Sequence, residues 1–143
     1  MEAEKNTKPA TVSNFATESS RFVNFLLLSS YICMRVNLIK QKTIRDFVLE
    51  NARSKVSFED WLVKIKFADW QTPEDIKKTF NSADFLGKGS NRIVFDIAGN
   101  NYRIICKYGF GENEVHLFVC WIGTHAQYTK LCHRNEQYTV NIF

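Results

Sequence analysis

The second half of the chain alternates between apolar and polar residues in three runs separated by short turns rich in glycine and asparagine. Alternation with a period of two puts successive side chains on opposite faces of a strand. The pattern therefore predicts three antiparallel strands joined by two hairpin turns. The strands are expected at residues 92–98, 102–108 and 115–122, and the turns at 99–101 and 109–113.

Helical spacing of apolar residues comes before these strands. Thr43 can cap a helix that runs to about Asn51. Ser57, followed three residues later by Asp60, predicts the start of a second helix with a capping box. Pro73 begins a short third helix, since proline suits the first helical turn. The aromatic residues of these helices are expected to form the core.

The remaining elements lie at the two ends of the pattern. Residues 35–39 alternate and predict a first strand, residues 82–86 a short edge strand, and residues 138–143 a terminal strand. Thr124 is expected to cap a last helix from His125 to about Cys132. Helices clustered before a strand meander predict an α+β fold. We expect a two-layer domain with an antiparallel sheet packed on the N-terminal helices and a C-terminal helix.

The alternation also sorts the charged residues by face. Arg92, Arg103, Lys107 and His116 are expected on one face of the strands, together with Ile122. The opposite, apolar face is expected to include Trp121 and to pack on the helices. Asp96 is the acid on the cationic face, where it can pair with Arg92 or Arg103. Arg103 and Lys107 would be roughly 13 Å apart along one strand, about two nucleotides of RNA backbone.

Composition places the chain among single-domain globular proteins. It has 143 residues, twelve of them Phe, and a formal net charge of +4. Residues 1–33 contribute no net charge, so the basic excess lies in residues 34–143. An anionic partner such as nucleic acid is plausible on this ground, although charge alone does not demand one. The four cysteines form no CxxC pair, and we expect no metal and no cofactor.

The first part of the chain differs from the rest. Residues 1–21 are polar, and residues 22–32 are apolar but shorter than the roughly 20 residues that cross a bilayer. We expect residues 1–33 to be disordered or a spurious N-terminal extension, with Met34 as the natural start of a domain covering 34–143. A genuine tail or a weak signal sequence is the alternative.

Three further positions have both a chemical and an ordinary explanation. His125 and Tyr128 can reach one side of the last helix, but His125 can equally be a surface residue beside a capping threonine. His116 can be a cross-strand partner. Lys88 is at the tip of a Gly-Lys-Gly turn that lacks the full phosphate-loop pattern.

Several segments together resemble the HigB toxin family of type II toxin–antitoxin modules. They read FEDWLVKIKFADWQTPEDIKKTF, ADFLGKGSNRIVFDI, GNNYRIICKY and VHLFVCWIGTHAQYTKL. The resemblance covers residues 34–143 and implies the RelE/ParE fold. It also implies an mRNA interferase, an endoribonuclease that cleaves messenger RNA, commonly on the translating ribosome, and so inhibits translation. Such toxins are cytoplasmic, have no membrane partner and are held silent in a hetero-oligomeric complex with a HigA-like helix-turn-helix antitoxin.

The resemblance also assigns roles to residues. It implies catalytic roles for Arg103, Lys107 and His125. RNA contacts are expected from the following residues: Lys88, Arg92, Asn101, Tyr102, His116 and Tyr128. Because RNA carries its own nucleophile in the 2′-hydroxyl, such an enzyme can work without a metal. Two alternatives stay open at this point: a ParE-like toxin that inhibits gyrase, and a non-catalytic module that binds RNA or protein.

Overall fold

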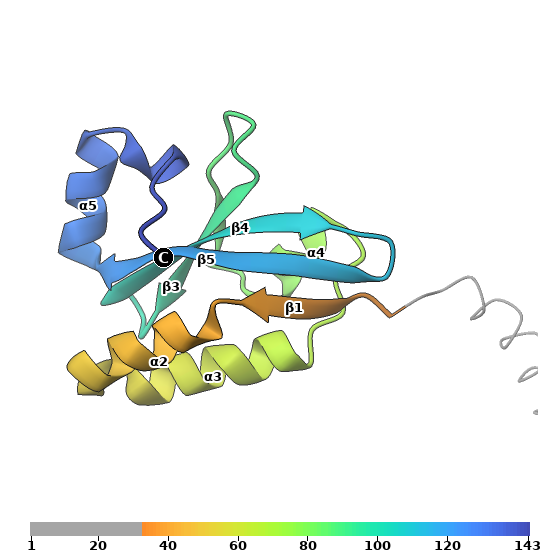
Figure 1. The fold of residues 1–143 in the computed structure, drawn as a ribbon, viewed down its shortest axis with the longest axis horizontal. Helices are drawn as coiled ribbons and strands as arrows, with labels where there is room; N and C mark the ends of the chain where they lie inside the picture. The colour runs from red at the N-terminus through yellow and green to blue at the C-terminus, as the bar shows by residue number, and fades with distance from the viewer. Residues whose placement is uncertain (1–32) are drawn as a thin grey trace, which may run out of the picture. The chain divides into compact units, whose positions relative to one another are not determined.

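The structure is a computed structural model that describes residues 33–143, which form one compact unit. Apart from Cys33, the predictions made for residues 1–33 lie outside the described residues. A five-stranded sheet in the order β1-β5-β4-β3-β2 runs through the domain (Figure 1). The strands are β1 (Arg35–Ile39), β2 (Asp84–Phe85), β3 (Arg92–Ile97), β4 (Tyr102–Phe110) and β5 (Glu114–Thr124). The helices are α2 (Gln41–Glu50), η2 (Ala52–Ser54), α3 (Lys55–Lys66), α4 (Pro73–Thr79), α5 (His125–His133) and η3 (Glu136–Tyr138).

The sheet is mixed, whereas we predicted an antiparallel one. The neighbours from β2 to β5 pair antiparallel, as expected for strands joined by hairpins. The first strand, β1, lies parallel to β5 at the edge of the sheet. Because α2, α3 and α4 lie between β1 and the meander in sequence, no tight turn imposes an antiparallel arrangement on β1. The α+β class and the helix layer are as predicted.

Helices α2 and α3 cover one face of the sheet (Figure 1). Phe58, Trp61 and Ile65 of α3 are buried in this layer, as their spacing predicted. The Trp61 and Phe95 rings meet edge to face, with centroids 5.3 Å apart. This is the main hydrophobic core. It holds the sheet rigidly from one side, so the chemistry of the other face rests on a fixed support.

A second, smaller core lies on the other face, beneath α5. Val94, Ile105, Cys120, Trp121 and Leu131 form it. Our prediction for Trp121 and Ile122 was wrong, because their faces are exchanged. A bulge in β5 causes the exchange: Ile105 pairs with Trp121 and Cys106 with Val119, so Cys120 is an extra residue. One inserted residue reverses the alternation beyond it.

Two predictions of element ends were also wrong. Ser57 and Asp60 lie inside α3, which begins at Lys55, so they do not form its N-terminal cap. The segment from residue 139 onward forms no strand, although the backbone N–H of Ile142 bonds to the Cys120 carbonyl of β5 at 3.1 Å. The predicted start of α4 at Pro73 is confirmed, with a capping box between Thr72 and Asp75. No helix within residues 33–143 is long and apolar enough to span a membrane.

Candidate active site

Arg103 lies at the centre of the candidate site, on the face of the sheet that carries α5. It is directly opposite Asp96 in the β3–β4 ladder, and its Nε is 3.0 Å from the Asp96 carboxylate. Its Nη2 donates to the Asn100 side chain, and its Nη1 to the Tyr102 carbonyl at 3.4 Å. An arginine has five N–H donors, so these contacts fix the group and leave donors for a ligand. Arg103 is only 9% exposed.

The start of α5 brings His125 to the same end of the sheet. The backbone N–H of His125 bonds to the carbonyl of Asn101 in the β3–β4 loop, at 2.9 Å. Thr124 and Gln127 form a capping box at this helix end. The imidazole of His125 is exposed. This backbone hydrogen bond joins the β3–β4 loop to the start of α5, although Asn101 and His125 are 24 positions apart in the sequence.

The charges of Arg103 and His125 act on Asp96. Burial raises the pKa of the Asp96 carboxyl, and Arg103 is the largest influence in the opposite direction. Asp84 raises the same pKa and His125 lowers it. The Asp96 carboxyl therefore keeps its proton to a higher pH than an ordinary surface aspartate does.

Tyr128 covers Arg103 from α5. The guanidinium carbon is 5.8 Å from the centre of the Tyr128 ring, a cation–π contact. The Trp121 ring also packs against the tyrosine, with ring centroids 6.1 Å apart. Burial raises the pKa of the Tyr128 hydroxyl well above its ordinary value. Tyr128 is therefore a neutral phenol whose ring contacts both Arg103 and Trp121.

Arg92 and Lys107 are opposite each other in the β3–β4 ladder. Each is four residues along its strand from the pair formed by Asp96 and Arg103. Arg92 is 8% exposed and donates from Nη1 to the carbonyl of Val140. Lys107 is exposed. The predicted cationic face is therefore not open along its whole length, because α5 and the C-terminal segment cover part of it. Of these two cations, Lys107 is the one available to solvent.

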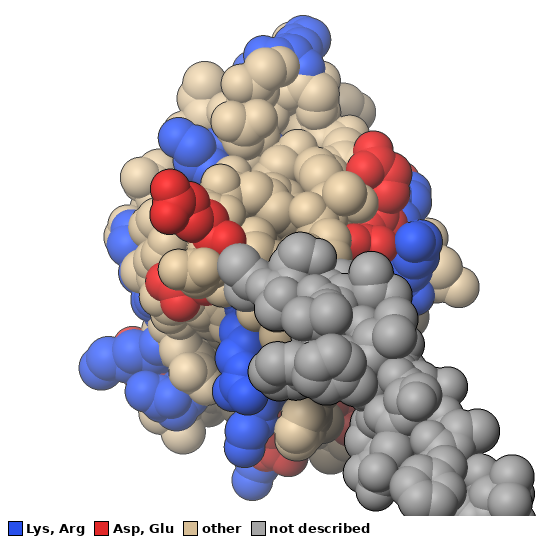
Figure 2. Space-filling model, turned by 90° about the vertical axis from the view of Figure 1, so that its right-hand side faces the viewer, with Lys and Arg blue, Asp and Glu red and all other residues tan. Residues whose placement is uncertain are grey.

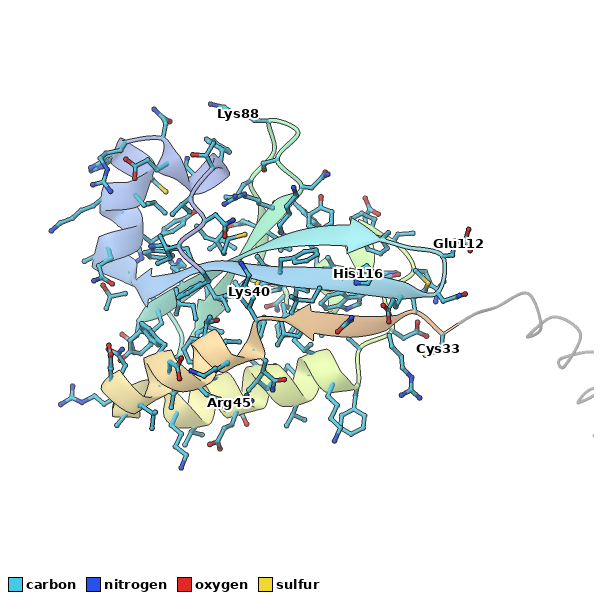
Figure 3. All side chains as sticks on the ribbon, viewed as in Figure 1. Cys33, Lys40, Arg45, Lys88, Glu112 and His116 are labelled. Carbon is cyan, nitrogen blue, oxygen red and sulfur yellow. The ribbon has the colours of Figure 1, made fainter. Side chains whose placement is uncertain are left out.

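Lys88 and His116 lie away from this site. Lys88 is at the tip of the loop before β3 and His116 on the far half of β5 (Figure 3). The Lys88 ammonium lies over the Tyr138 ring at 4.5 Å. His116 Nε2 is 3.4 Å from the Glu114 carboxylate, and its Nδ1 is buried without a partner among residues 33–143. The structure thus brings Asn101, Arg103, His125 and Tyr128 together. The predicted RNA-binding residue Tyr102 points to the other face of the sheet, where its ring packs against Phe47 of α2 with centroids 5.8 Å apart.

The pattern analysis did not include Asn100 and Gln127. Asn100 is in a tight turn, where asparagine is common because it tolerates turn conformations of the backbone. Its presence in the sequence therefore did not predict its contact with Arg103. Gln127 had a signature, because Thr124 followed three residues later by Gln is a capping-box pattern. The pairing of Asp96 with Arg103 was one of the two partners expected for that acid, and it is confirmed.

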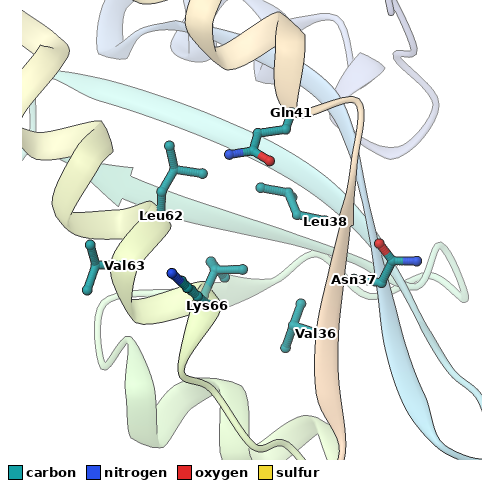
Figure 4. A pocket seen from close by; sticks show the side chains of 8 residues that line it. Val36, Asn37, Leu38, Gln41, Leu62, Val63 and Lys66 are labelled. Atoms are coloured by element: carbon teal, nitrogen blue, oxygen red, sulfur yellow. The ribbon is translucent and has the colours of Figure 1, made fainter.

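Within residues 33–143, no group of three or more His, Cys, Asp or Glu side chains is placed to hold a metal ion. A cavity of about 360 Å³ between β1 and α3 is lined mainly by Val36, Leu38, Leu62 and neighbouring residues (Figure 4). On the face shown in Figure 2, Lys and Arg are mixed with Asp and Glu instead of forming one basic patch.

Comparison with known proteins assigns the chain to a class with this kind of α+β fold, the RelE-like toxins. The model of the family HigB_toxin, the RelE-like toxic component of a toxin–antitoxin system, matches residues 54–131. That match spans more than half of the 143 residues and includes every predicted site residue. The chain therefore belongs to the HigB toxin family, which confirms the resemblance.

A curated relative is the protein named mRNA interferase HigB of Escherichia coli O6:H1, strain CFT073. The two sequences are 36% identical over 67 residues, which are 47% of this chain and 63% of the relative. The match therefore spans somewhat less than two thirds of that relative's length.

Proposed function

We propose that this chain is the toxin of a toxin–antitoxin module and acts as a metal-independent mRNA interferase. It cleaves messenger RNA on the ribosome in the cytoplasm and so inhibits translation. The observation that supports this most directly is the cluster around Arg103. Its nearly buried guanidinium lies against Tyr128 and pairs with Asp96, whose pKa His125 also lowers. The name of the relative and the family of the chain support the same activity.

The reaction we propose uses the RNA's own 2′-hydroxyl. The 2′-oxygen attacks the adjacent phosphorus, the bond from phosphorus to the 5′-oxygen breaks, and the products are a 2′,3′-cyclic phosphate and a 5′-hydroxyl. One proton leaves the 2′-oxygen and one is delivered to the 5′-oxygen. No metal is required in such a sequence, because a base, an acid and a cation suffice.

The roles follow from where each group lies. Arg103 donates to the phosphate with the N–H groups that Asp96, Asn100 and Tyr102 leave available, because a guanidinium matches phosphate oxygens. His125 transfers a proton, since the reference pKa of histidine is near neutrality. Tyr128 stacks on a base or orients a phosphate oxygen. Lys107 binds the backbone of the RNA farther along the sheet.

The partners belong to the same proposal. A toxin component implies an antitoxin, and we propose a HigA-like helix-turn-helix protein that forms a hetero-oligomeric complex with this chain. The other partner is ribosome-bound messenger RNA.

The test is to induce the chain in cells and map message ends by primer extension. We expect new ends within messages, and we expect Arg103→Ala and His125→Ala each to lower cleavage by about 10²–10⁴-fold. His133→Ala is the matched control, because His133 is an exposed histidine at the opposite end of α5. Urea titrations check that each variant is folded.

Other outcomes would identify a different function. Intact messages together with DNA damage and filamentation would indicate a gyrase inhibitor. RNA binding without any product would indicate a non-catalytic module. If both site variants cleave as well as the unsubstituted chain, the assignment of Arg103 and His125 is wrong.

A further inference from the structure

The guanidinium of Arg103 is held by acceptors that come from two different segments of the chain. Asp96 is directly opposite it on β3, and a carboxylate oxygen of Asp96 is 3.0 Å from Nε. The side-chain oxygen of Asn100, in the β3–β4 loop, accepts from Nη2. The Tyr102 carbonyl accepts from Nη1 at 3.4 Å, which is a long and weak bond. Asp96 and Asn100 are therefore the side chains that fix the guanidinium.

These contacts also decide which N–H groups of Arg103 remain for a ligand. A guanidinium has five of them, one on Nε and two on each terminal nitrogen. Asp96 accepts from the one on Nε. Asn100 and the Tyr102 carbonyl each accept from one of the terminal nitrogens. One N–H group therefore remains on each terminal nitrogen, and two such donors in one plane match two oxygens of a phosphate.

The loop that carries Asn100 also reaches the helix of His125. Ala98 in this loop has a φ of 58°, which is uncommon for a residue with a side chain and persists only where surrounding contacts hold it. The N–H of Asn101 bonds back to the Ala98 carbonyl at 3.2 Å, and the Asn101 carbonyl accepts from the His125 N–H at 2.9 Å. One tight turn therefore connects the residue that holds Arg103 to the first residue of α5.

Shielding from solvent makes the partners of Arg103 hard to replace by water. The side chain of Arg103 is 11% exposed and that of Asp96 27%. Within residues 33–143, Asp96 is the acid that pairs with Arg103. Removal of one partner from a shielded ion pair leaves the other charge without compensation. A guanidinium on a long side chain then adopts several orientations, of which few suit a phosphate.

We infer that Asp96 and Asn100 are positioning residues, which orient Arg103 so that its two remaining N–H groups meet the scissile phosphate. The inference rests on the proposed function. Neither residue contacts the RNA in this role, because each acts through Arg103. A misplacement of about 1 Å can lower a rate about 10²-fold, so loss of this orientation lowers turnover more than binding.

Cleavage of a defined message on purified ribosomes tests the inference, since rates at saturating and limiting concentrations of the full chain separate turnover from binding. We expect Asp96→Ala and Asn100→Ala each to lower the maximal rate roughly 10–100-fold and to change the half-saturating concentration less than about threefold. Asp96→Asn keeps an oxygen acceptor for Nε and should recover most of the rate. Asp46→Ala is the control, because it removes an exposed ion pair of 2.7 Å with Lys42 on α2.

A double substitution separates action through Arg103 from a direct role. If Asp96 acts through Arg103, Asp96→Ala should cost less than about threefold further once Arg103 is replaced by alanine. A full further loss would mean that Asp96 itself transfers a proton, and it would overturn the inference. Equal loss in Asp96→Asn and Asp96→Ala would overturn it too.

Two more results would contradict the positioning role. One is full activity in both alanine variants at Asp96 and Asn100. The other is a loss that only follows the unfolded fraction measured by urea titration, which would make the contacts merely structural. If the unsubstituted chain cleaves no message at all, the proposed function fails, and this inference fails with it.

Discussion

Arg103 shows why a single side chain can be both structural and chemical. It bonds to Asp96, Asn100 and Tyr102 and lies against the ring of Tyr128. These contacts remove most of the rotational freedom of a long side chain, so little entropy remains to be lost when a phosphate binds. A group held in this way before the substrate arrives is what electrostatic stabilisation of a transition state requires.

Gly123 is the residue whose small size this arrangement needs most. It pairs with Arg103 across the β4–β5 ladder, and a Cβ there would come within 2.5 Å of the Trp121 ring and 2.7 Å of Gln127 Oε1. We expect Gly123→Ala to lower the free energy of unfolding by about 1–3 kcal/mol through overpacking. Urea denaturation measures it. Gly109→Ala is the control, because nothing lies within 4 Å of its Cβ; equal effects would contradict the explanation.

At the scale of elements, helix α5 decides where the chemistry lies. Its first residue follows β5 without a loop, and the Asn101 carbonyl accepts from the His125 N–H. The helix covers the second core through Leu131 and the half-buried Tyr128. The position of His125 thus depends on how firmly the first turn of α5 is held.

The cap of α5 can be tested by removing one hydroxyl. Thr124 Oγ1 accepts from the Gln127 N–H at 3.2 Å. We expect Thr124→Ala to lower the free energy of unfolding by about 1 kcal/mol and to reduce RNA cleavage. Thr129→Ala is a matched control in the same helix, where the hydroxyl only donates back to the His125 carbonyl. If the two variants unfold at the same urea concentration, the cap contributes nothing.

The elements that the sequence predicted well are those fixed by nearby residues. Alternation and turn residues placed β3, β4, β5 and α5 to within about two residues of their observed ends. The bulge at Cys120 could not be predicted, because it depends on how β5 pairs with β4 and on a side chain filling the space under α5. The parallel pairing of β1 also depends on distant partners.

The same division holds for the site. Strand parity alone assigned the cations to one face of the sheet. It could not predict that Arg92 is buried, because Arg92 donates to the Val140 carbonyl of the distant C-terminal segment. His125 came from the family resemblance, because its sequence context equally suits an incidental surface residue. Its proximity to Arg103 and Asp96 arises only when the β3–β4 loop bonds to α5.

At the scale of the whole molecule, the net positive charge is modest, and at least one face carries both signs of charge. The net charge is +4, and both Lys or Arg and Asp or Glu side chains appear on the face seen in Figure 2. A protein of this kind gains modest non-specific attraction to RNA and depends on a few cations near the site. Lys107 is the exposed cation on the strand of Arg103, four residues away.

Salt dependence can show whether Lys107 binds the RNA backbone. Each phosphate contact with single-stranded RNA contributes about −0.7 to the slope of log affinity against log salt concentration. We expect Lys107→Ala to make the slope less negative by about that amount, and Lys66→Ala, on α3 across the sheet, to leave it unchanged. Fluorescence anisotropy with 2′-O-methyl RNA measures binding without cleavage, because that RNA lacks the attacking hydroxyl. An unchanged slope for Lys107→Ala would place the RNA path elsewhere, and it would restrict the proposed interface to the surroundings of Arg103 and α5.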